Sequence, residues 1–387
     1  MNFRIKGRGV MVGILLTGFL IFGVNFLGAA EKPYKIGHVV SLTGTYSQLG
    51  EQQRRASIMY QEEVNKAGGV NGHPLEVIIV DSQSDPSKAV TALKSLFRDP
   101  EVAGICGGSS SAESLAMIPV SENEGIPYMS YGGSIDIAEP TKKWIFQVPT
   151  TDRVSMRDVL RFLKKRNLTR VAMLYSTGGW GKSGAERLKE QSPGAGFTVL
   201  GYESFGDKDV DMTPQLVRIR DLNPQAIITW TATTAGAIIS KNIKQLGIKA
   251  LHVHDHGFGY IKYLKVAGDA VNGDVVPLGK VLIAEQLDPS DPQKKMMLDF
   301  SQRYERRWNE PVANGAAYAT DGFMILKKAI EAVGPDRGKI RNYIENLKTF
   351  MGYYRVYSFG PDDHGSKETS ALVMVEVVNQ NWKLIKD

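Results

Sequence analysis

Short apolar runs alternate with amphipathic segments along the chain after residue 30. Runs such as YKIGHVV, LEVIIVD and AGIC end in small or polar residues, and segments with helical spacing of apolar positions follow the first two. We predict strands for these runs and helices over residues 51–67 and 86–97. Strands alternating with helices of about a dozen residues are typical of parallel sheets built from βαβ units.

The same rhythm returns in a second series from residue 152 onward. We predict strands at RVAMLYS, FTVLGYESF, QAIITWTA and ALHVHDH, and helices over residues 152–166, 182–190, 212–222 and 235–246. Beyond this series, VLIAEQL is predicted as a strand, residues 293–308 and 316–333 as helices, and the C-terminal segment as strands. Two such series predict an α/β protein of two lobes with a crevice between them, where ligands bind beyond the carboxyl ends of strands.

The stretch from Cys106 to Ser134 contains the clearest candidate site. Ser109–Ser111 follow one predicted strand and open a helix, and Gly132–Ser134 follow the next strand. Hydroxyls and backbone N–H groups therefore meet at one sheet edge. The first N–H groups of a helix lack intrahelical partners and favour an anion. We therefore expect a binding site for a carboxylate-bearing small molecule.

Residues 1–30 differ from the rest of the chain in their pattern of charged, apolar and small residues. Arg4, Lys6 and Arg8 precede an uncharged apolar run over residues 10–27, and Gly28-Ala29-Ala30 supplies small residues. This pattern is typical of a secretory signal peptide. The alternative is a membrane anchor, because the run is near the ~18-residue threshold. We expect cleavage after Ala30, export, and no lipid anchor, because no cysteine stands at that point.

Charge and cysteine content exclude several classes of protein. The formal net charge of +6 is a mild excess, and its densest runs, at residues 161–170 and 303–307, lie on amphipathic helices. We expect solvated helix faces there and no nucleic-acid partner. Cys106 is the only cysteine, so an intramolecular disulfide is impossible. Its place at the end of an apolar strand favours a buried structural thiol over a nucleophile.

Two tempting motifs give weak support for other chemistries. Gly178–Ser183 resembles a phosphate loop, but the required first glycine falls on Ser176. Trp180 either offers a flat wall to a ligand or packs within its loop. His252, His254 and His256 would share a face of one strand, which is unusual for a tetrahedral zinc site. We expect no metal, no cofactor and no enzymatic activity, because no nucleophile–base constellation is evident.

Several segments together resemble one known family. They are YKIGHVVSLTGTYSQLGEQQRRA, NKAGGVNGHPLEVIIVDSQSDPSKAV, the GGSSS loop, ENEGIPYMSYGGS, RVAMLYSTGGWGKSGAERLKE, YATDGFMILKKAIEAV and FGPDDHG. The chain resembles the leucine/isoleucine/valine-binding family, whose members are periplasmic type I substrate-binding proteins of ABC importers. The resemblance implies two hinge-linked lobes, each a largely parallel sheet with helices on both faces. It also implies a periplasmic monomer with ABC permease subunits as partners.

We place lobe 1 at residues 31–150 plus 281–358, and lobe 2 at 151–280 plus 359–387. The family's carboxylate grip maps onto Ser111, the Gly132 backbone and Ser134. Ser110 with Glu113 fits a capping box.

Other ligand-binding positions of the family map onto both lobes. An aromatic position of the second lobe falls at Trp180, and one of the first lobe falls at Leu49, near Tyr46. A second-lobe loop falls at Ala232 and Thr233.

The departure from the family lies at His256. The resemblance implies that amino-acid binders of the family have a glutamate at this position, which pairs with the α-ammonium of the ligand. Histidine cannot supply that negative charge. Burying an unpaired ammonium is costly. We therefore expect an aromatic or other organic acid without an α-ammonium. A branched-chain amino acid binder that uses another acid, and a sensory ligand-binding protein, remain as alternatives.

Overall fold

The computed structural model of the chain describes residues 1–2, 31–365 and 370–386. The predicted signal peptide falls on residues 3–30 almost throughout and so lies outside the described residues. Among the described residues, no helix combines the length and apolar character needed to cross a bilayer.

The first lobe is built on a five-stranded parallel sheet in the order β2-β1-β3-β4-β5. Its strands are β1 (Tyr34–Val40), β2 (Leu75–Asp81), β3 (Val102–Gly107), β4 (Tyr128–Ser130) and β5 (Ile145–Gln147). The connecting helices are α1 (Ser47–Lys66), α2 (Pro86–Leu96), α3 (Ser111–Glu124) and the short η1 (Ile135–Ile137). Each crossover joins parallel strands, as βαβ units require, and the crossover from β2 to β3 passes over β1.

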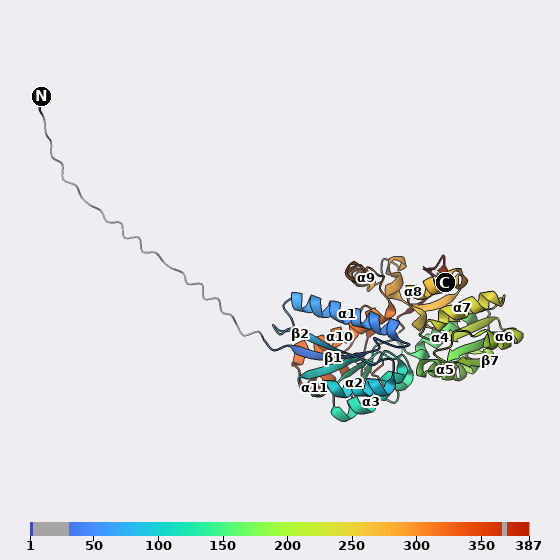
Figure 1. Cartoon of the computed structure of the whole chain (residues 1–387), viewed down its shortest axis with the longest axis horizontal. Helices are drawn as coiled ribbons and strands as arrows, with labels where there is room; N and C mark the ends of the chain where they lie inside the picture. The colour runs from blue at the N-terminus through green and yellow to red at the C-terminus, as the bar shows by residue number, and fades with distance from the viewer. Residues whose placement is uncertain (3–30, 366–369, 387) are drawn as a thin grey trace. The chain divides into compact units, whose positions relative to one another are not determined.

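Side-chain alternation along β1 explains why helices cover both faces of this sheet. Ile36 and Val40 point into the core shared with α1, whereas Val39 points into the core shared with α2 and α3. In Figure 1, α1 lies on one side of β1 and β2, and α2 and α3 lie on the other. A strand that is buried on both faces must be mostly apolar, and β1 departs from this rule only at Lys35, near its start, and at the buried His38.

Later segments of the chain complete the first lobe. The long helix α10 (Asn314–Val333) packs on α1 and β3, and α11 (Arg337–Glu345) packs on α10. The hairpin β11 (Phe350–Met351) and β12 (Val356–Tyr357) follows. Helix α9 (Lys294–Trp308) contacts both α1 and η4 (Lys280–Gln286). The N-terminal turn of α10 is thereby brought next to the loops that follow β1 and β3.

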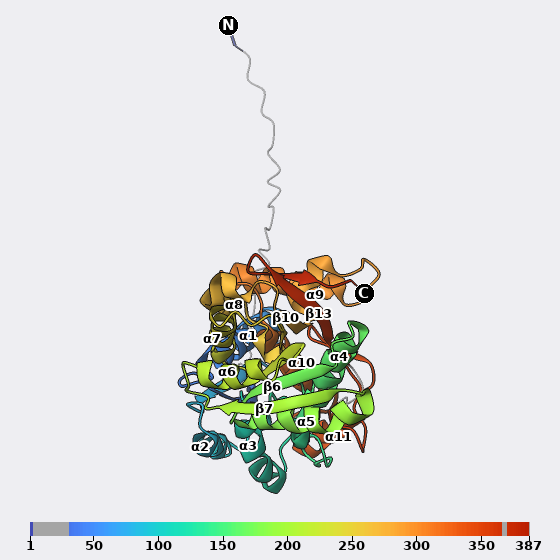
Figure 2. The ribbon, with the colours of Figure 1, turned by 90° about the vertical axis from the view of Figure 1, so that its right-hand side faces the viewer.

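The second lobe holds a seven-stranded sheet in the order β14-β13-β10-β9-β8-β6-β7. Its strands are β6 (Arg170–Ser176), β7 (Thr198–Phe205), β8 (Ala226–Trp230), β9 (Leu251–His254), β10 (Val275–Gly279), β13 (Leu372–Val378) and β14 (Asn381–Leu384). The first five are parallel, whereas β13 and β14 join antiparallel. The C-terminal segment therefore extends the sheet at the β10 edge (Figure 2).

Helices again cover both faces of the second sheet. They are α4 (Asp152–Lys165), α5 (Gly179–Ala195), α6 (Thr213–Asp221), α7 (Ala235–Gln245) and α8 (Ile261–Ala267), with the short η2 (His256–Phe258) and η3 (Gly268–Val271). Val171 and Met173 of β6 pack with α4 and α5, and Ala172 and Leu174 pack with α6 and α7. Val253 of β9 faces α4 and α5, so His252 and His254 face α7.

The predicted fold class is confirmed, and one predicted element is wrong. VLIAEQL lies in η4 rather than in a strand. A short apolar run is compatible with either a strand or a buried helical turn, and here β10 has already ended at Gly279. The lobe boundaries stay a prediction. Phe359 and His364 pack on Phe146 of β5, so this segment contacts the first lobe before the chain reaches β13.

Candidate functional site

A cavity with about 620 Å³ of empty space, partly open to solvent, lies where the two lobes meet. Its walls come from loops of both lobes: Tyr46, Leu49, Gln52, Ser109, Ser110, Ser111, Tyr131, Gly133, Pro149, Trp180, Ala232, His256, Gly257, Gly259, Tyr260, Tyr263, Asn314, Gly315 and Tyr318.

Strand ends position most of these residues. Ser109–Ser111 follow β3, Tyr131 and Gly133 follow β4, and Ala232 follows β8. His256 comes two residues after the end of β9, at the start of η2. The cavity therefore lies at the carboxyl ends of parallel strands in both lobes, where ligands of open α/β sheets bind.

The N-terminus of α3 forms one wall of the cavity. Ser110 is its N-cap, and its Oγ accepts a hydrogen bond from the Glu113 N–H at 3.2 Å, while the Ser110 N–H donates to Glu113 Oε2 at 2.8 Å. The predicted capping box is thus present. Ser111 Oγ accepts hydrogen bonds from the N–H groups of Gly133 and Ser134, each at 3.2 Å. Among the described residues no acceptor takes the Ser111 hydroxyl proton, so this proton can point into the cavity.

A buried hydrogen-bond network around Glu113 holds this wall in place. The Glu113 carboxylate accepts hydrogen bonds from the hydroxyls of Ser41, at 2.8 Å, and Ser82. Glu113 and Ser41 are fully buried. The network fixes the first turn of α3 relative to β1 and β2, so its N–H groups hold a constant direction.

Trp180 lines the cavity from the second lobe, but its N–H is not offered to a ligand. The indole Nε1–H donates to Asp255 Oδ1 at 2.9 Å. The Trp180 ring meets the His256 ring edge-on, with centroids 5.1 Å apart. A methyl group added at Gly133 would lie 2.6 Å from Trp180 Cζ3. Trp180 therefore presents a flat apolar surface that touches the first lobe.

Asp255 is buried behind Trp180 and does not line the cavity. Besides Trp180, its carboxylate accepts hydrogen bonds from the N–H groups of Thr231 and Gly257, both at 2.7 Å. Burial raises the pKa of Asp255 to about 7, against the lowering effect of these hydrogen bonds. Asp255 orients the loop and the indole ring.

Two lining residues each have a buried side-chain atom without a hydrogen-bond partner among the described residues. These atoms are His256 Nδ1 and Asn314 Oδ1. Asn314 Nδ2 donates to the His256 backbone oxygen at 3.1 Å, which joins the two lobes. Burial lowers the pKa of His256 to about 3, so its imidazole is neutral at physiological pH. Buried polar atoms without partners are rare in folded proteins and call for an explanation.

The cavity is lined without formal charge. None of its lining residues, all within the described ranges, is Asp, Glu, Lys or Arg. Aromatic side chains dominate instead, because Tyr46, Tyr131, Trp180, Tyr260, Tyr263 and Tyr318 all contribute. Such a site suits a ligand with an apolar body and few polar groups.

Polar contacts join the lobes beside the cavity. The Tyr46 hydroxyl donates to Asp207 Oδ2 at 3.1 Å. Ser134 Oγ lies 2.7 Å from Ser183 Oγ of α5, which in turn donates to Asp152. The structure therefore shows the lobes in contact around the cavity.

The structure sorts the residues predicted from the sequence into two groups. Ser110, Ser111, Trp180, His256, Ala232, Tyr46 and Leu49 line the cavity, whereas Gly132, Ser134 and Thr233 do not. The Gly132 N–H donates to Ser114 Oγ at 3.0 Å, and the Thr233 hydroxyl pairs with that of Thr231 at 3.1 Å. Their polar groups are thus engaged within the protein, and Ser134 joins the lobes through Ser183.

Sequence reasoning missed Asn314 and most of the tyrosines. Tyr131 follows β4, Tyr260 and Tyr263 lie around the start of α8, and Asn314 and Tyr318 lie in the first turns of α10. No local pattern marked them, because tyrosine is common in cores and α10 reads as an ordinary buried helix.

Comparison with known proteins agrees with this geometry. A family model described as periplasmic binding protein matches residues 33–381. The chain belongs to that family, and within it to the leucine/isoleucine/valine-binding type I proteins.

Individual relatives are distant in sequence and close in fold. The leucine-, isoleucine-, valine-, threonine-, and alanine-binding protein of Pseudomonas aeruginosa is 25% identical over 83% of this chain and 84% of its own length. A type 1 periplasmic binding protein from Bordetella pertussis superposes with a TM-score of 0.82 at 22% identity, over 92% of this chain and 100% of the other. A leucine-binding protein from Thermotoga maritima gives 0.80 at 23% identity, over 91% and 97% of the two chains.

Proposed function

We propose that this protein is the periplasmic solute-binding component of an ABC importer. In this role it captures a small organic acid without an α-ammonium by hinge closure and delivers it to membrane permease subunits. Family membership supports the transport role and export to the periplasm. The role is binding rather than catalysis.

The N-terminus of α3 supports a carboxylate as the shared part of the ligand. The first N–H groups of a helix and its dipole favour an anion without a counter-charge in the site. The Ser111 hydroxyl adds a donor, since its lone pairs are already occupied by two backbone N–H groups.

The uncharged lining of the cavity is the main observation that favours an acid without an α-ammonium over an amino acid. An amino acid brings a cation that needs an anion within the closed site, and an unpaired buried cation costs several kcal/mol. Asp255 is already engaged by three donors. Asp207 accepts from Tyr46 and does not line the cavity.

His256 and Asn314 support a neutral polar group elsewhere on the ligand. His256 Nδ1 and Asn314 Oδ1 each lack a partner among the described residues. A hydroxyl or carbonyl group next to an aromatic ring would satisfy one or both, while the ring stacks against Trp180 and the tyrosines. A hydroxylated aromatic acid meets all of these conditions.

An amino acid is the competing ligand, because relatives carry that name. The Pseudomonas aeruginosa protein is named for leucine, isoleucine, valine, threonine and alanine, and the Thermotoga maritima protein for leucine. Asp207, whose Oδ1 has no partner among the described residues, is the carboxylate that would have to serve an ammonium.

Matched ligand pairs test the proposal by titration calorimetry on the purified mature protein. Tyrosine is compared with 3-(4-hydroxyphenyl)propanoate, and leucine with 4-methylpentanoate, because each pair differs only in the α-ammonium. We expect the acid without the ammonium to bind at least about tenfold tighter in each pair. Tighter binding of leucine or tyrosine would overturn the proposed ligand class. Equal binding of an acid and its methyl ester would overturn the carboxylate grip.

A further inference from the structure

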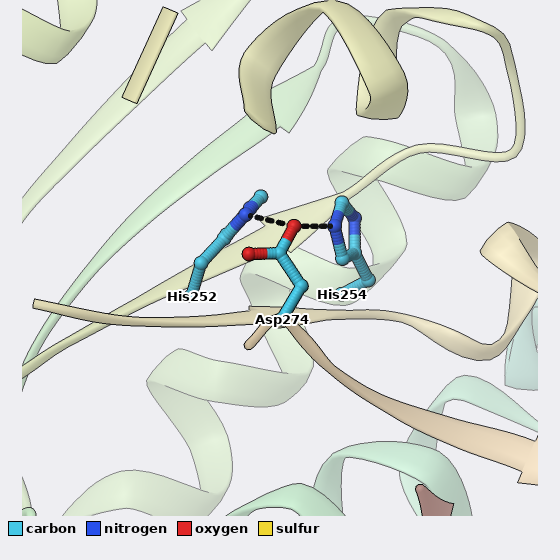
Figure 3. Close-up of side chains that lie close together, drawn as sticks. All are labelled: His252, His254 and Asp274. Atoms are coloured by element: carbon cyan, nitrogen blue, oxygen red, sulfur yellow. Dashed lines mark hydrogen bonds and ion pairs between the residues drawn. The ribbon is translucent and has the colours of Figure 1, made fainter. Parts of the chain in front are cut away.

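A second polar cluster lies in the second lobe, away from the cavity walls. His252 and His254 come from the same face of β9, and Asp274 immediately precedes the neighbouring strand β10. Figure 3 shows both imidazoles directed at the Asp274 carboxylate. All three side chains are buried, and their potential ligand atoms lie within 4.8 Å of one another.

The distances within this cluster are close to those of a metal site. His252 Nδ1 and His254 Nε2 each lie 2.9 Å from the same oxygen, Asp274 Oδ2. In a tetrahedral zinc site, metal–ligand distances of about 2.0–2.2 Å place adjacent ligand atoms about 3.3 Å apart. Outward shifts of a few tenths of an ångström would therefore admit an ion. Two histidines and one carboxylate are also a known zinc ligand set.

The charge of the cluster favours a cation. Among the described residues, the ion pairs of Asp274 are those with His252 and His254. A buried carboxylate is costly unless a cation or several hydrogen bonds offset its charge. A divalent cation would neutralise it.

Surrounding residues hold the three side chains in place. Thr229 Oγ1 lies 2.8 Å from His252 Nε2, the ring nitrogen that points away from Asp274. A hydrogen bond at this second ring nitrogen orients the imidazole of a metal-binding histidine. The His254 ring stacks on Phe258 at 3.8 Å. Ser240 Oγ lies 2.6 Å from Asp274 Oδ2 and 3.3 Å from His254 Nε2, where it or a water molecule would complete four ligands.

We propose that His252, His254 and Asp274 form a structural binding site for a divalent transition-metal ion of the zinc type. The ion fastens β9 to the start of β10 beneath α7. The sequence alone pointed away from this site, because three histidines on one strand fit a tetrahedral ion poorly. The tertiary structure instead brings in Asp274 and leaves His256 in η2.

The test uses untagged, chelator-treated protein that is titrated with ZnCl₂ in the absence of organic ligand. We expect one equivalent of zinc to bind and the Tm to rise. Co²⁺ should give the visible absorption bands of a tetrahedral complex. Asp274→Asn should abolish both effects. His38→Gln, which alters a buried histidine of the first lobe, should retain them.

Two results would overturn the proposal. The first is a folded wild-type protein that binds no stoichiometric zinc or cobalt. The second is unchanged binding in Asp274→Asn. If Asp274→Asn does not fold, His252→Gln takes its place. The Co²⁺ spectrum of the wild-type protein decides the matter without any variant. None of these measurements depends on the identity of the organic ligand.

Discussion

The Tyr46 hydroxyl of the first lobe donates a hydrogen bond to Asp207 Oδ2 of the second lobe at 3.1 Å. Tyr46 also lines the cavity and is the residue that precedes α1. Asp207 lies just after β7, next to Gly178 at the start of α5. This contact links a cavity wall directly to the opposite lobe, so the proposed hinge opening would break it.

Removing this hydroxyl should weaken closure. Tyr46→Phe keeps the ring against the cavity and loses one hydrogen bond to a carboxylate. For a pair that is partly exposed we expect a loss of about 1 kcal/mol, or about fivefold in affinity for 3-(4-hydroxyphenyl)propanoate. Stopped-flow measurements should show faster release of the ligand rather than slower capture.

A double-mutant cycle supplies the control for Tyr46→Phe. Asp207→Asn should cause a similar loss, and the two changes together should cost little more than either alone, because they remove the same contact. Fully additive losses would show that the hydrogen bond does not contribute to the closed state.

Ser111 should be needed for every carboxylate ligand. Ser111→Ala removes the hydroxyl that faces the cavity and also leaves the Gly133 and Ser134 N–H groups without their acceptor. We expect about tenfold weaker binding of both 4-methylpentanoate and 3-(4-hydroxyphenyl)propanoate, with a stability loss of about 1–3 kcal/mol. Calorimetry and urea unfolding measure the two effects separately.

Ser111→Thr and Ser134→Ala are the matched controls for Ser111→Ala. Threonine retains the hydroxyl and should retain most of the affinity. Ser134 does not line the cavity and contacts Ser183, so Ser134→Ala should change affinity less than Ser111→Ala. A larger loss of affinity in Ser134→Ala than in Ser111→Ala would show that Ser134 is the main contact of the ligand carboxylate. Ser134 is one of the positions that the family resemblance implies for this contact.

His256 should decide between organic acids and amino acids. His256→Glu introduces an anion at the cavity wall, where an α-ammonium would neutralise it. We expect this variant to lose at least about tenfold in affinity for 3-(4-hydroxyphenyl)propanoate and to gain measurable binding of leucine or tyrosine. His256→Gln, which stays neutral, should keep the preference for acids. Leucine binding by the wild-type protein, unchanged in His256→Glu, would remove His256 from this role.

The buried histidine His38 should make folding stability depend on pH. Its Nδ1 lies 3.1 Å from Ser57 Oγ, and burial lowers its pKa from 6.5 to about 3. Below pH 6.5 the unfolded chain binds a proton that the folded protein does not. His38 therefore lowers stability by up to about 1.4 kcal/mol per pH unit as the pH falls toward 3.

Urea unfolding at pH 7, 5.5 and 4.5 measures this effect. His38→Gln should lose stability less steeply than wild type as the pH falls. Ser57→Ala is the control, because it removes the partner and keeps the imidazole. It should be less stable at every pH with the steep dependence retained. Parallel curves for wild type and His38→Gln would show that His38 is protonated in the folded state.

The alternation of apolar runs and helical segments was enough to predict the architecture. β1 to β4 and β6 to β9 lie where the runs predicted strands, whereas VLIAEQL is η4, and β5 and β10 were not predicted. A βαβ unit buries both faces of its strand, so its apolar signal is strong and local. The capping box at Ser110 was equally readable, because it depends on residues three positions apart.

The cavity could be predicted only in part, since its walls come from segments far apart in the sequence. Ser111, Trp180 and His256 follow strands and were found by that rule. Asn314 and Tyr318 reach the cavity because α10 returns to pack on α1, and no local pattern shows that return. From the sequence, the Trp180 N–H could have been a donor to the ligand, but in the fold it donates to Asp255.

The sequence by itself determined the local elements, the two-lobed α/β class and the hydroxyl-rich turn at the start of α3. These features depend on periodicity and on neighbours within a few residues. The tertiary structure alone decided that the cavity is lined without charge and that Asp274 joins His252 and His254. It also decided that His256 and Asn314 each keep a polar atom without a partner among the described residues. The physical reason is that these properties belong to pairs of side chains that only packing brings within hydrogen-bond distance.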